Sequence, residues 1–390
     1  MKSMHCTGAA VAVLLLASAA FGQQARKPVK IGLIAEFSGP FAEYGRQIEN
    51  GMKAYLKIHG DSFAGRKIEI LERDTTGPSP EIAKRLAAEL VTRDHADFLV
   101  GFGLTPNALA ATAVATQAKK PMIVMNAAAS VITSKSPYVV RVSQTIAQMS
   151  SPMAQWAHRN GIRKVYTLVA DYAPGLDAET TFKKVFTGLG GTVVDSARVP
   201  LSNPDFAPFI QRIKDARPEA VFLFLPAGEQ GIAFMKSFTE RGLSQAGIKV
   251  IATGDLTDDG VLEAMGDPTL GIITSFHYSV AHDSPENKEF LAAYARVAGD
   301  KRPNFMAVAG YDGMAAVDEV VRKADGEIDG EKAMAALKGW KRQSPRGPIS
   351  IDPDTRDIVQ TVYIRRVEKV GGKLFNVEFD KFPAVRDPGK

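Results

Sequence analysis

Two short segments of this chain carry residue types that suit the binding of a small anion. Thr105-Pro106 follows the apolar stretch 97–101 and opens a helix-forming segment. Threonine favours the N-cap and proline the first helical position, and the free N–H groups of a helix start attract anions. The second segment, 127–130 (Ala-Ala-Ala-Ser), follows the apolar stretch 122–125, and its small residues would let backbone amides approach a ligand closely. A local role as a cap or a tight-packing loop is the alternative for both.

Residues 29–51 place an aromatic side chain in a comparable position. The apolar run Val29–Ala35 predicts a buried parallel strand, and Ser38-Gly39-Pro40 predicts a turn. A helix-forming segment follows, with Tyr44 near its start. Because open α/β sheets bind ligands at the carboxyl ends of their strands, we expect Tyr44 to lie near a binding cleft. Ordinary packing on a helix face is the alternative.

These segments are set within an alternation of apolar strands and amphipathic helices. Strands are expected at 29–35, 164–169 and 192–199, for example, and a helix at 80–92. This rhythm predicts parallel sheets covered by helices on both faces. The strands are too many for one sheet of ordinary size, so we expect two α/β lobes. Near the C-terminus, a hairpin is expected around Gly371-Gly372.

The first 22 residues predict a cleavable export signal. Lys2 provides the positive start, an apolar core runs from Val11 to Leu16, and small residues precede Gln23. The apolar run falls short of the ~20 residues that a membrane span needs. The one cysteine, Cys6, lies within this signal. The mature chain is therefore expected to contain no disulfide and to be exported to the periplasm.

Charge and motifs argue against several classes of function. The formal net charge is +5 over 390 residues, and the charges are interspersed, which argues against nucleic-acid binding. The six histidines lack metal-ligand spacing, and neither Gly-x-Ser-x-Gly nor a Gly-Lys-Ser/Thr phosphate loop is present. The clustered Asp255, Asp258 and Asp259 do not match a calcium loop. We therefore expect no enzyme activity, no cofactor and no metal.

Seven stretches together resemble the periplasmic solute-binding proteins of branched-chain amino-acid ABC transporters, a family close to the leucine/isoleucine/valine-binding protein. In order along the chain, they are SGPFAEYG (38–45), GRKIEILERDTTGPSPEIAKRLAAELV (65–91), VGFGLTPNALA (100–110), PMIVMNAAAS (121–130), SPYVVRVS (136–143), ADYAPGLDAE (170–179) and GYDGMAAV (310–317). The resemblance extends from about residue 27 to the C-terminus.

The resemblance implies a type I periplasmic binding protein fold. Two doubly wound parallel-sheet lobes would be joined by a three-segment hinge. After the signal peptide at 1–22, lobe 1 would comprise residues 28–142 and 277–346. Lobe 2 would comprise residues 143–276 and 347–390. The crossings between the lobes would lie near 136–143, 275–278 and 346–351.

The resemblance also implies which residues hold a carboxylate. In the family, the loops that correspond to Thr105 and to 127–130 donate backbone N–H and hydroxyl groups to the ligand's carboxylate. We therefore expect Thr105, Ala128, Ala129 and Ser130 to form this part of the site. In this interpretation lobe 1 binds the charged end of the ligand.

Aromatic residues would enclose the rest of the ligand. Tyr44 matches a family tyrosine on the ligand's apolar side. Tyr172 would close over the ligand from lobe 2, although Ala173 replaces the glycine that usually follows. Tyr278 is a further candidate wall beside His277 at the expected hinge. For Tyr278 and His277, packing in the core or hinge is the alternative.

Two departures from the family pattern concern the ligand's identity. Pro226-Ala227-Gly228 stands where amino-acid-binding members carry an aromatic residue. Those members also carry an acid that pairs with the ligand's ammonium, and Asp255 lies close to that place without aligning cleanly. If Asp255 reaches the cleft, an amino-acid ligand fits. If it does not, a hydrophobic carboxylate without an amine, such as an aromatic acid, fits better.

We therefore expect the substrate-binding component of an ABC importer. It would capture a small carboxylate-bearing, hydrophobic solute, either an aromatic acid or a branched-chain amino acid, as a monomer. Closure around the ligand would let it dock on membrane permease subunits. The alternative is a ligand-sensing module of the same fold that signals to a partner.

Overall fold

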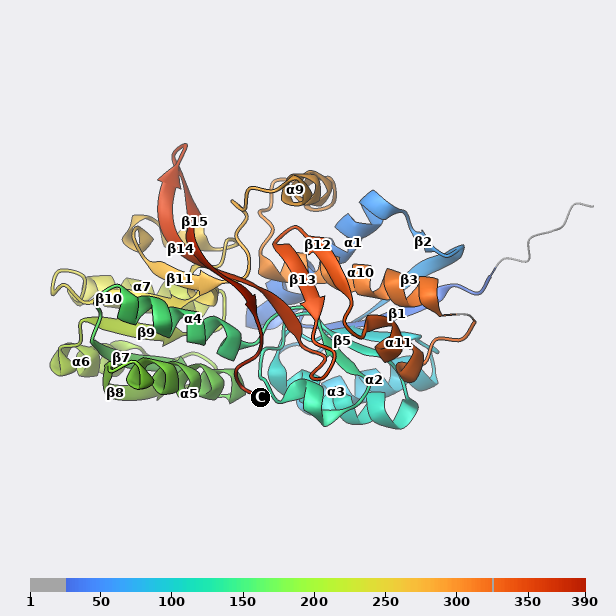
Figure 1. The fold of residues 1–390 in the computed structure, drawn as a ribbon, viewed down its shortest axis with the longest axis horizontal. Helices are drawn as coiled ribbons and strands as arrows, with labels where there is room; N and C mark the ends of the chain where they lie inside the picture. The colour runs from blue at the N-terminus through green and yellow to red at the C-terminus, as the bar shows by residue number, and fades with distance from the viewer. Residues whose placement is uncertain (1–25, 325) are drawn as a thin grey trace, which may run out of the picture.

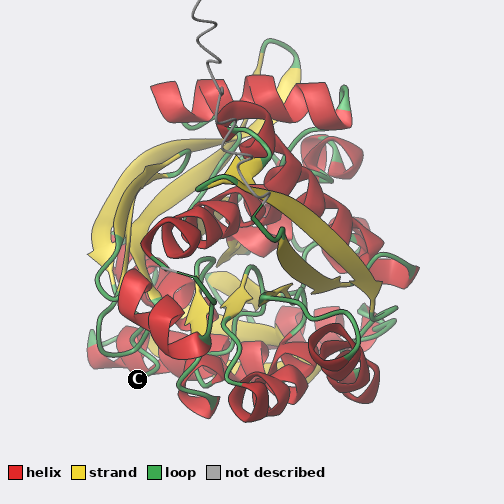
Figure 2. Cartoon of the chain, turned by 90° about the vertical axis from the view of Figure 1, so that its right-hand side faces the viewer, coloured by secondary structure: helices red, strands yellow, loops and turns green. Residues whose placement is uncertain are grey.

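The fold is described from a computed structural model that covers residues 26–324 and 326–390. The predicted signal peptide, 1–22, lies outside the described residues. Two lobes stand beside each other along the long axis of the molecule (Figure 1). Figure 2 shows helices flanking the strands in the end-on view. The predicted class, two doubly wound α/β lobes, is confirmed.

Lobe 1 is built on a six-stranded sheet in which every pairing among β1, β3, β4, β5 and β6 is parallel. The short β2 pairs antiparallel with β3 at one edge. In spatial order the strands are β2 (Ser62–Phe63), β3 (Arg66–Asp74), β1 (Val29–Ala35), β4 (Phe98–Gly101), β5 (Met122–Val124) and β6 (Val139–Arg141). The chain moves from β1 to β3 on one side and then to β4 on the other. The strand order therefore reverses between β1 and β4, where ligands bind in such sheets.

Helices cover both faces of this sheet because successive side chains of a strand point to opposite faces. Ile31 and Leu33 of β1 pack with one group of helices, whereas Ile34 packs with the other group. The first group contains α1 (Ala42–His59), α9 (Pro285–Ala298), α10 (Phe305–Lys323) and α11 (Gly330–Leu337); the second contains α2 (Pro80–Thr92) and α3 (Thr105–Ala118).

Lobe 2 is built on the parallel half of a nine-stranded sheet, whose antiparallel half continues into lobe 1. The parallel half runs β11 (Ile273–Phe276), β10 (Lys249–Thr253), β9 (Ala220–Phe224), β7 (Lys164–Ala170) and β8 (Thr192–Val199). Its strand order reverses between β7 and β9, so this lobe also has a switch point. The antiparallel half consists of β12 (Lys341–Ser344), β13 (Gly347–Ile351), β14 (Ile358–Val370) and β15 (Lys373–Val385). The hairpin expected around Gly371-Gly372 is confirmed as β14–β15.

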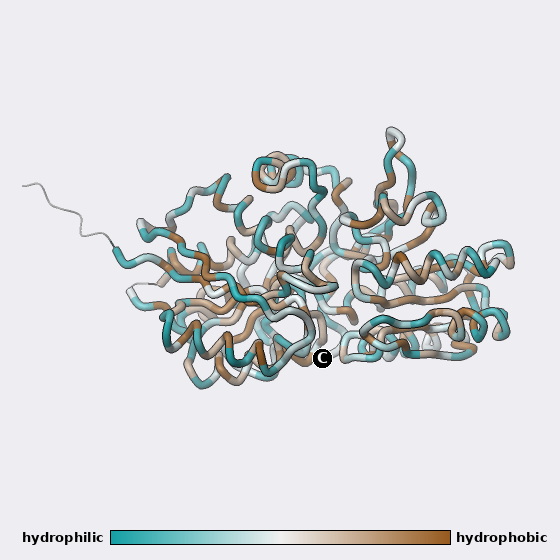
Figure 3. Tube along the Cα trace, turned by 180° about the vertical axis from the view of Figure 1, so that it is seen from behind, coloured by the Kyte–Doolittle hydropathy of each residue, from teal (hydrophilic) through white to brown (hydrophobic). Residues whose placement is uncertain are grey.

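The helices of lobe 2 divide between its two faces in the same way. Val165 and Val169 of β7 pack with α4 and α5, whereas Tyr166 and Leu168 pack with α6 and α7. The helices of this lobe are α4 (Ile146–Arg159), α5 (Ala173–Gly188), α6 (Ala207–Ala216), α7 (Glu229–Glu240) and α8 (Leu262–Met265). Hydrophobic residues concentrate on the inner strands and hydrophilic residues on the outer helices (Figure 3).

The chain crosses between the lobes after β6, after β11 and within β14. Ile358 and Val362 of β14 pack in the core of lobe 1, whereas Ile364 packs in a core of lobe 2. The pairing of β14 with β15 shifts register between Gln360 and Val362 and again between Ile364 and Arg365, on both sides of this changeover. The boundary expected between residues 346 and 347 stays a prediction, but this packing favours a boundary inside β14.

Candidate ligand-binding site

The loops that follow the central strands of the two lobes meet across the cleft. The Tyr44 hydroxyl of lobe 1 donates a hydrogen bond to the Ala227 carbonyl oxygen of lobe 2 at 3.1 Å. The Ser130 amide of lobe 1 donates to Asp177 Oδ2 on α5 of lobe 2 at 2.8 Å. These contacts join the lobes directly, so the structure describes a closed arrangement.

Thr105 braces the loop that follows β5. It is 2 % exposed, and its Oγ1 accepts a hydrogen bond from the Ala129 amide at 3.3 Å. The expected N-cap role is wrong by one position: Leu104 is the N-cap, and no side chain caps the helix. Thr105 instead occupies the first turn, where backbone N–H groups lack intrahelical partners. Because its hydroxyl oxygen accepts from Ala129, its hydroxyl proton can still be donated to a ligand.

The 127–130 loop presents Ala128 at its middle. Ala128 is 8 % exposed and shares a hydrophobic cluster with the partly buried Tyr172, whereas Ala129 is fully buried. Ser130 uses both of its hydrogen-bonding groups: its amide binds Asp177, and its Oγ donates to Asp387 Oδ1 at 2.9 Å. Two carboxylates therefore flank Ser130, and their charge disfavours an anionic ligand at that position. Ser130 as a ligand contact stays a prediction.

Two tyrosines from opposite lobes provide aromatic surface near this loop. Tyr172 is the N-cap of α5, and its ring stacks on Phe224 with a centroid separation of 6.0 Å and an interplanar angle of 17°. Tyr44 packs edge-on against Phe41 at 5.3 Å. Burial raises the pKa of both hydroxyls well above the usual value, and the negative charge of Asp255 acts in the same direction on both. Both hydroxyls therefore stay protonated and can donate hydrogen bonds.

Asp255 lies in the short helical turn Gly254–Thr257 after β10. It is 7 % exposed, and its Oδ2 accepts a hydrogen bond from Thr253 Oγ1 at 2.9 Å. Burial raises the pKa of its carboxyl to about 6, although the positive charge of Arg365 acts in the opposite direction. The Asp255 charge raises the pKa of both tyrosine hydroxyls, and Asp255 as a ligand contact stays a prediction.

The two hinge candidates occupy different surroundings. The Tyr278 hydroxyl donates to Asn287 Oδ1 at 3.0 Å, and its ring packs edge-on against Phe290 in the core of lobe 1. The His277 ring is fully buried beside Phe276, and within the described chain neither ring nitrogen has a hydrogen-bond partner. Burial lowers the pKa of His277 well below the usual value, so the ring is neutral. Tyr278 as a ligand contact stays a prediction.

Sequence reasoning did not identify Glu36, which directly follows β1. Its Oε1 accepts hydrogen bonds from Asn107 Nδ2 at 2.8 Å and from Thr75 Oγ1 at 3.3 Å. Its Oε2 has no partner among the described residues and would lie 1.9 Å from a Cβ atom at Gly103. Complete burial raises the pKa of this carboxyl to about 7. The sequence could have indicated Glu36, because it is an acid directly after a buried strand at the point where the strand order reverses.

Asp258 was considered only as part of an acidic turn, yet it bridges the lobes. Its Oδ2 accepts a hydrogen bond from Asn304 Nδ2, at the start of α10, at 2.8 Å. Burial, with a smaller contribution from the charge of the neighbouring Asp259, raises the pKa of its carboxyl to about 7. Asp258 also lines an interlobe groove of about 390 Å³; the lining residues include Pro40, Glu43, Tyr44, Gln47, Ala227, Gly228, Lys301, Arg302 and Asn304.

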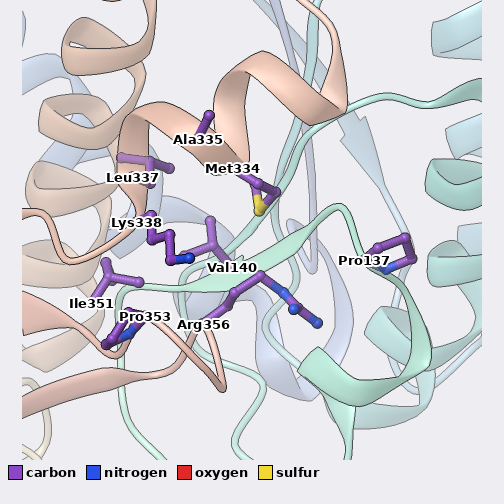
Figure 4. A pocket seen from close by; sticks show the side chains of 9 residues that line it. All are labelled: Pro137, Val140, Met334, Ala335, Leu337, Lys338, Ile351, Pro353 and Arg356. Atoms are coloured by element: carbon purple, nitrogen blue, oxygen red, sulfur yellow. The ribbon is translucent and has the colours of Figure 1, made fainter.

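A separate pocket of about 220 Å³ lies in lobe 1, where α11 approaches the turn between β13 and β14 (Figure 4). Met334 and Leu337 of α11 face Ile351 and Arg356 across it. No residue that we singled out for ligand binding lines it, so this pocket is distinct from the cleft.

In residues 26–324 and 326–390, no group of three or more His, Cys, Asp or Glu side chains is arranged to hold a metal ion. No helix in the same ranges is long and apolar enough to cross a membrane.

Comparison with known proteins adds to this geometry. A family model described as periplasmic binding protein matches residues 28–373. The chain is 44% identical over 391 residues to the Leu/Ile/Val-binding protein homolog 6 of Brucella melitensis, and the match covers 100% of this chain and 99% of that protein.

Two solved structures resemble the chain over 93% of its length and 99% of theirs. One is the solute-binding protein of an ABC transporter from Rhodopseudomonas palustris BisB5 in complex with 3,4-dihydroxybenzoic acid, at 56% identity and a TM-score of 0.90. The other is a solute-binding protein of an ABC transporter from R. palustris in complex with 4-hydroxybenzoate, at 44% identity and a TM-score of 0.91.

Proposed function

Because the chain belongs to the periplasmic binding protein family, we propose that it captures an aromatic carboxylate bearing a ring hydroxyl and delivers it to an ABC-transporter permease. The solved structures that it resembles at 56% and 44% identity are ABC-transporter solute-binding proteins with hydroxylated benzoic acids bound. Their ligands support the aromatic class, and the family supports a periplasmic location.

The proposed binding mode places the carboxylate in lobe 1. The start of α3 would contribute N–H groups, Thr105 a hydroxyl proton and Ala128, which is 8 % exposed, its backbone amide. A hydrogen bond to a charged group contributes roughly 1.5–3 kcal/mol net. Two or three such bonds would provide a good part of the ~8 kcal/mol that a micromolar ligand requires.

The ring would lie between Tyr44 and Tyr172, with its hydroxyl directed at Asp255. The observation that carries this proposal is that the two tyrosines reach across the lobes. Tyr44 of lobe 1 binds the Ala227 carbonyl of lobe 2, and Tyr172 of lobe 2 stacks on Phe224 and clusters with Ala128 of lobe 1. An aromatic ring favours offset or edge-on contact with neighbouring aromatic rings. The Asp255 carboxylate has two oxygens, and Oδ2 already accepts from Thr253. The remaining acceptor capacity suits the proton of a phenolic hydroxyl.

A branched-chain amino acid is the second candidate, and the same acid supports it. Asp255 would then pair with the ligand's ammonium group, and the name of the relative that is 44% identical points to this class. The two candidates differ in what Asp255 recognises. A phenol offers one proton on an uncharged group, whereas an ammonium group offers a full positive charge.

Calorimetric titration of the mature protein with 4-hydroxybenzoate, benzoate and leucine separates the candidates. We expect 4-hydroxybenzoate to bind more tightly than benzoate. Asp255→Ala should weaken 4-hydroxybenzoate roughly tenfold or more, because the buried hydroxyl loses its acceptor, while benzoate binding changes little. Asp283→Ala is a matched control, since Asp283 is exposed and paired with Lys288. Tight leucine binding without any binding of the aromatic acids would overturn the proposal.

Closure is the step that the permease would recognise. A ligand shifts the equilibrium between open and closed forms only by its differential affinity for the two forms. A ligand held by Thr105 from lobe 1 and by Tyr172 and Asp255 from lobe 2 bonds both lobes only when they are closed. Delivery can be measured as ligand-dependent stimulation of ATP hydrolysis by the reconstituted transporter. If the ligand binds but produces no stimulation, the sensing alternative is favoured.

A further inference from the structure

After β15 ends at Val385, the last five residues of the chain run back to the 127–130 loop. In Figure 1 the C-terminus lies between the two lobes, below the strands that connect them. β15 itself pairs with β14, and the sequence predicts that this tail belongs to lobe 2. The contacts of the tail extend to both lobes.

Asp387 joins the lobes through one carboxylate oxygen. Its Oδ1 accepts hydrogen bonds from Ser130 Oγ at 2.9 Å and from Thr145 Oγ1 at 3.0 Å. Ser130 belongs to the 127–130 loop of lobe 1, and Thr145 is the N-cap residue of α4 in lobe 2. The amide of Gly389 donates to the same oxygen at 2.9 Å, which folds the tail around the carboxylate.

The residues on either side of Asp387 hold the tail in place. Arg386 pairs with Asp352 at 3.0 Å. Lys390 Nζ binds Thr133 Oγ1 and Asp357 Oδ2, and Asp357 is the buried partner of Arg141.

Gly389 packs directly on the 127–130 loop. A Cβ atom there would lie 2.2 Å from Ser130 Oγ, so only glycine allows this approach. Together with the ion pairs, this close packing shows that the tail is fitted to the surface it covers.

We propose that the C-terminal pentapeptide 386–390 is a strap between the lobes, and that Asp387 is a positioning residue for the 127–130 loop. Opening the cleft separates Ser130 from Thr145 at the start of α4. The Asp387 carboxylate then loses the hydrogen bond from Ser130, from Thr145 or from both. The strap therefore favours the closed arrangement and holds Ala128 where a ligand carboxylate would meet it. This role does not depend on which ligand binds.

Hydrogen exchange of the ligand-free protein tests the strap without any assumption about the ligand. In Asp387→Ala and in a chain ending at Val385, exchange of the amides of residues 127–133 should accelerate by about tenfold or more, because bonds to a charged acceptor are lost. Amides of β7 provide the internal reference and should not change. Asp380→Ala is the matched control, since Asp380 lies on β15, pairs with Arg159 at the surface and otherwise accepts from the neighbouring Lys381 amide.

A conservative variant separates positioning from general stability. Asp387→Asn keeps the Oδ1 acceptor and changes only Oδ2, which has no partner in the described part of the chain. We expect it to restore slow exchange at 127–133. Small-angle X-ray scattering should show a larger radius of gyration for ligand-free Asp387→Ala than for Asp387→Asn. Unchanged exchange at 127–133 in the folded variants, or an equal acceleration in β7, would overturn the proposal.

Discussion

Replacing Glu36 with glutamine should remove a large pH dependence of stability. Glu36 is completely buried after β1, and burial raises the pKa of its carboxyl from 4.5 to about 7. Glutamine keeps the Oε1 atom that accepts from Asn107 and Thr75. Its amide nitrogen takes the place of Oε2, which has no partner among the residues described. The substitution therefore removes the titration while keeping these two hydrogen bonds.

The sign and the size follow from the direction of the shift. A carboxyl whose pKa is higher in the folded than in the unfolded protein contributes its full stability below the unfolded value. That contribution is lost as the pH rises through the folded value, here between about 4.5 and about 7. At 1.36 kcal/mol per pKa unit, wild type should lose about 3 kcal/mol over this interval from Glu36 alone. Glu36→Gln should lose none of this contribution.

Urea unfolding at intervals between pH 5 and pH 9 measures this difference. We expect the free energy of unfolding of Glu36→Gln to increase relative to that of wild type as the pH rises. The difference should become constant above pH 7. Glu43→Gln is the control, because Glu43 has a side chain that is 54% exposed and pairs with Arg46 on the surface. Parallel curves for wild type and Glu36→Gln across the whole range would refute the reasoning.

Three further substitutions test other contacts. Tyr44→Phe removes the hydrogen bond to the Ala227 carbonyl, which contributes ~0.5–1.5 kcal/mol to the closed form. Ligand affinity measured by calorimetry should therefore fall roughly two- to tenfold. Unchanged affinity would show that this contact does not favour closure. Gly103→Ala places a methyl group against Glu36 and should destabilise the protein by ~1–3 kcal/mol in urea unfolding, unless the carboxyl moves aside and the curves coincide. Asp357→Ala removes the carboxylate that pairs with the buried Arg141 guanidinium, and it should lower the free energy of unfolding by ~3–5 kcal/mol in urea. A decrease under 1 kcal/mol would show that this ion pair is not needed for stability.

Much of the architecture could be predicted because it depends on local patterns. The strand expected at 29–35 and the helix expected at 80–92 form with the bounds assigned to them. A continuous apolar run indicates a strand buried on both faces, and proline with a preceding serine marks a helix start. The hairpin around Gly371-Gly372 was predicted from its glycine pair, although its strands, expected at 359–367 and 373–379, extend to Ile358–Val370 and Lys373–Val385.

The features that were missed depend on contacts between residues far apart in the chain. Nothing near Asp387 in the sequence shows that its carboxylate binds Ser130, 257 residues away. The buried state of Glu36 depends on Asn107 and Thr75, which the fold brings to it from other segments. The hydrogen bond from Tyr44 to the Ala227 carbonyl, 183 residues away, likewise depends on how the lobes close. Local patterns carry no information on such distances.

The two register shifts that flank the changeover in β14 have a mechanical consequence. A hydrogen-bonded ribbon that continues from one lobe into the other resists bending, so the rotation of the lobes must be absorbed as torsion of β14 and β15. Irregular pairings increase local twist and interrupt the ladder, so the torsional stiffness is lowest between Gln360 and Arg365. The axis of lobe rotation should therefore pass through this short stretch. The intact ladder on either side would act as an elastic stop that limits how widely the cleft opens.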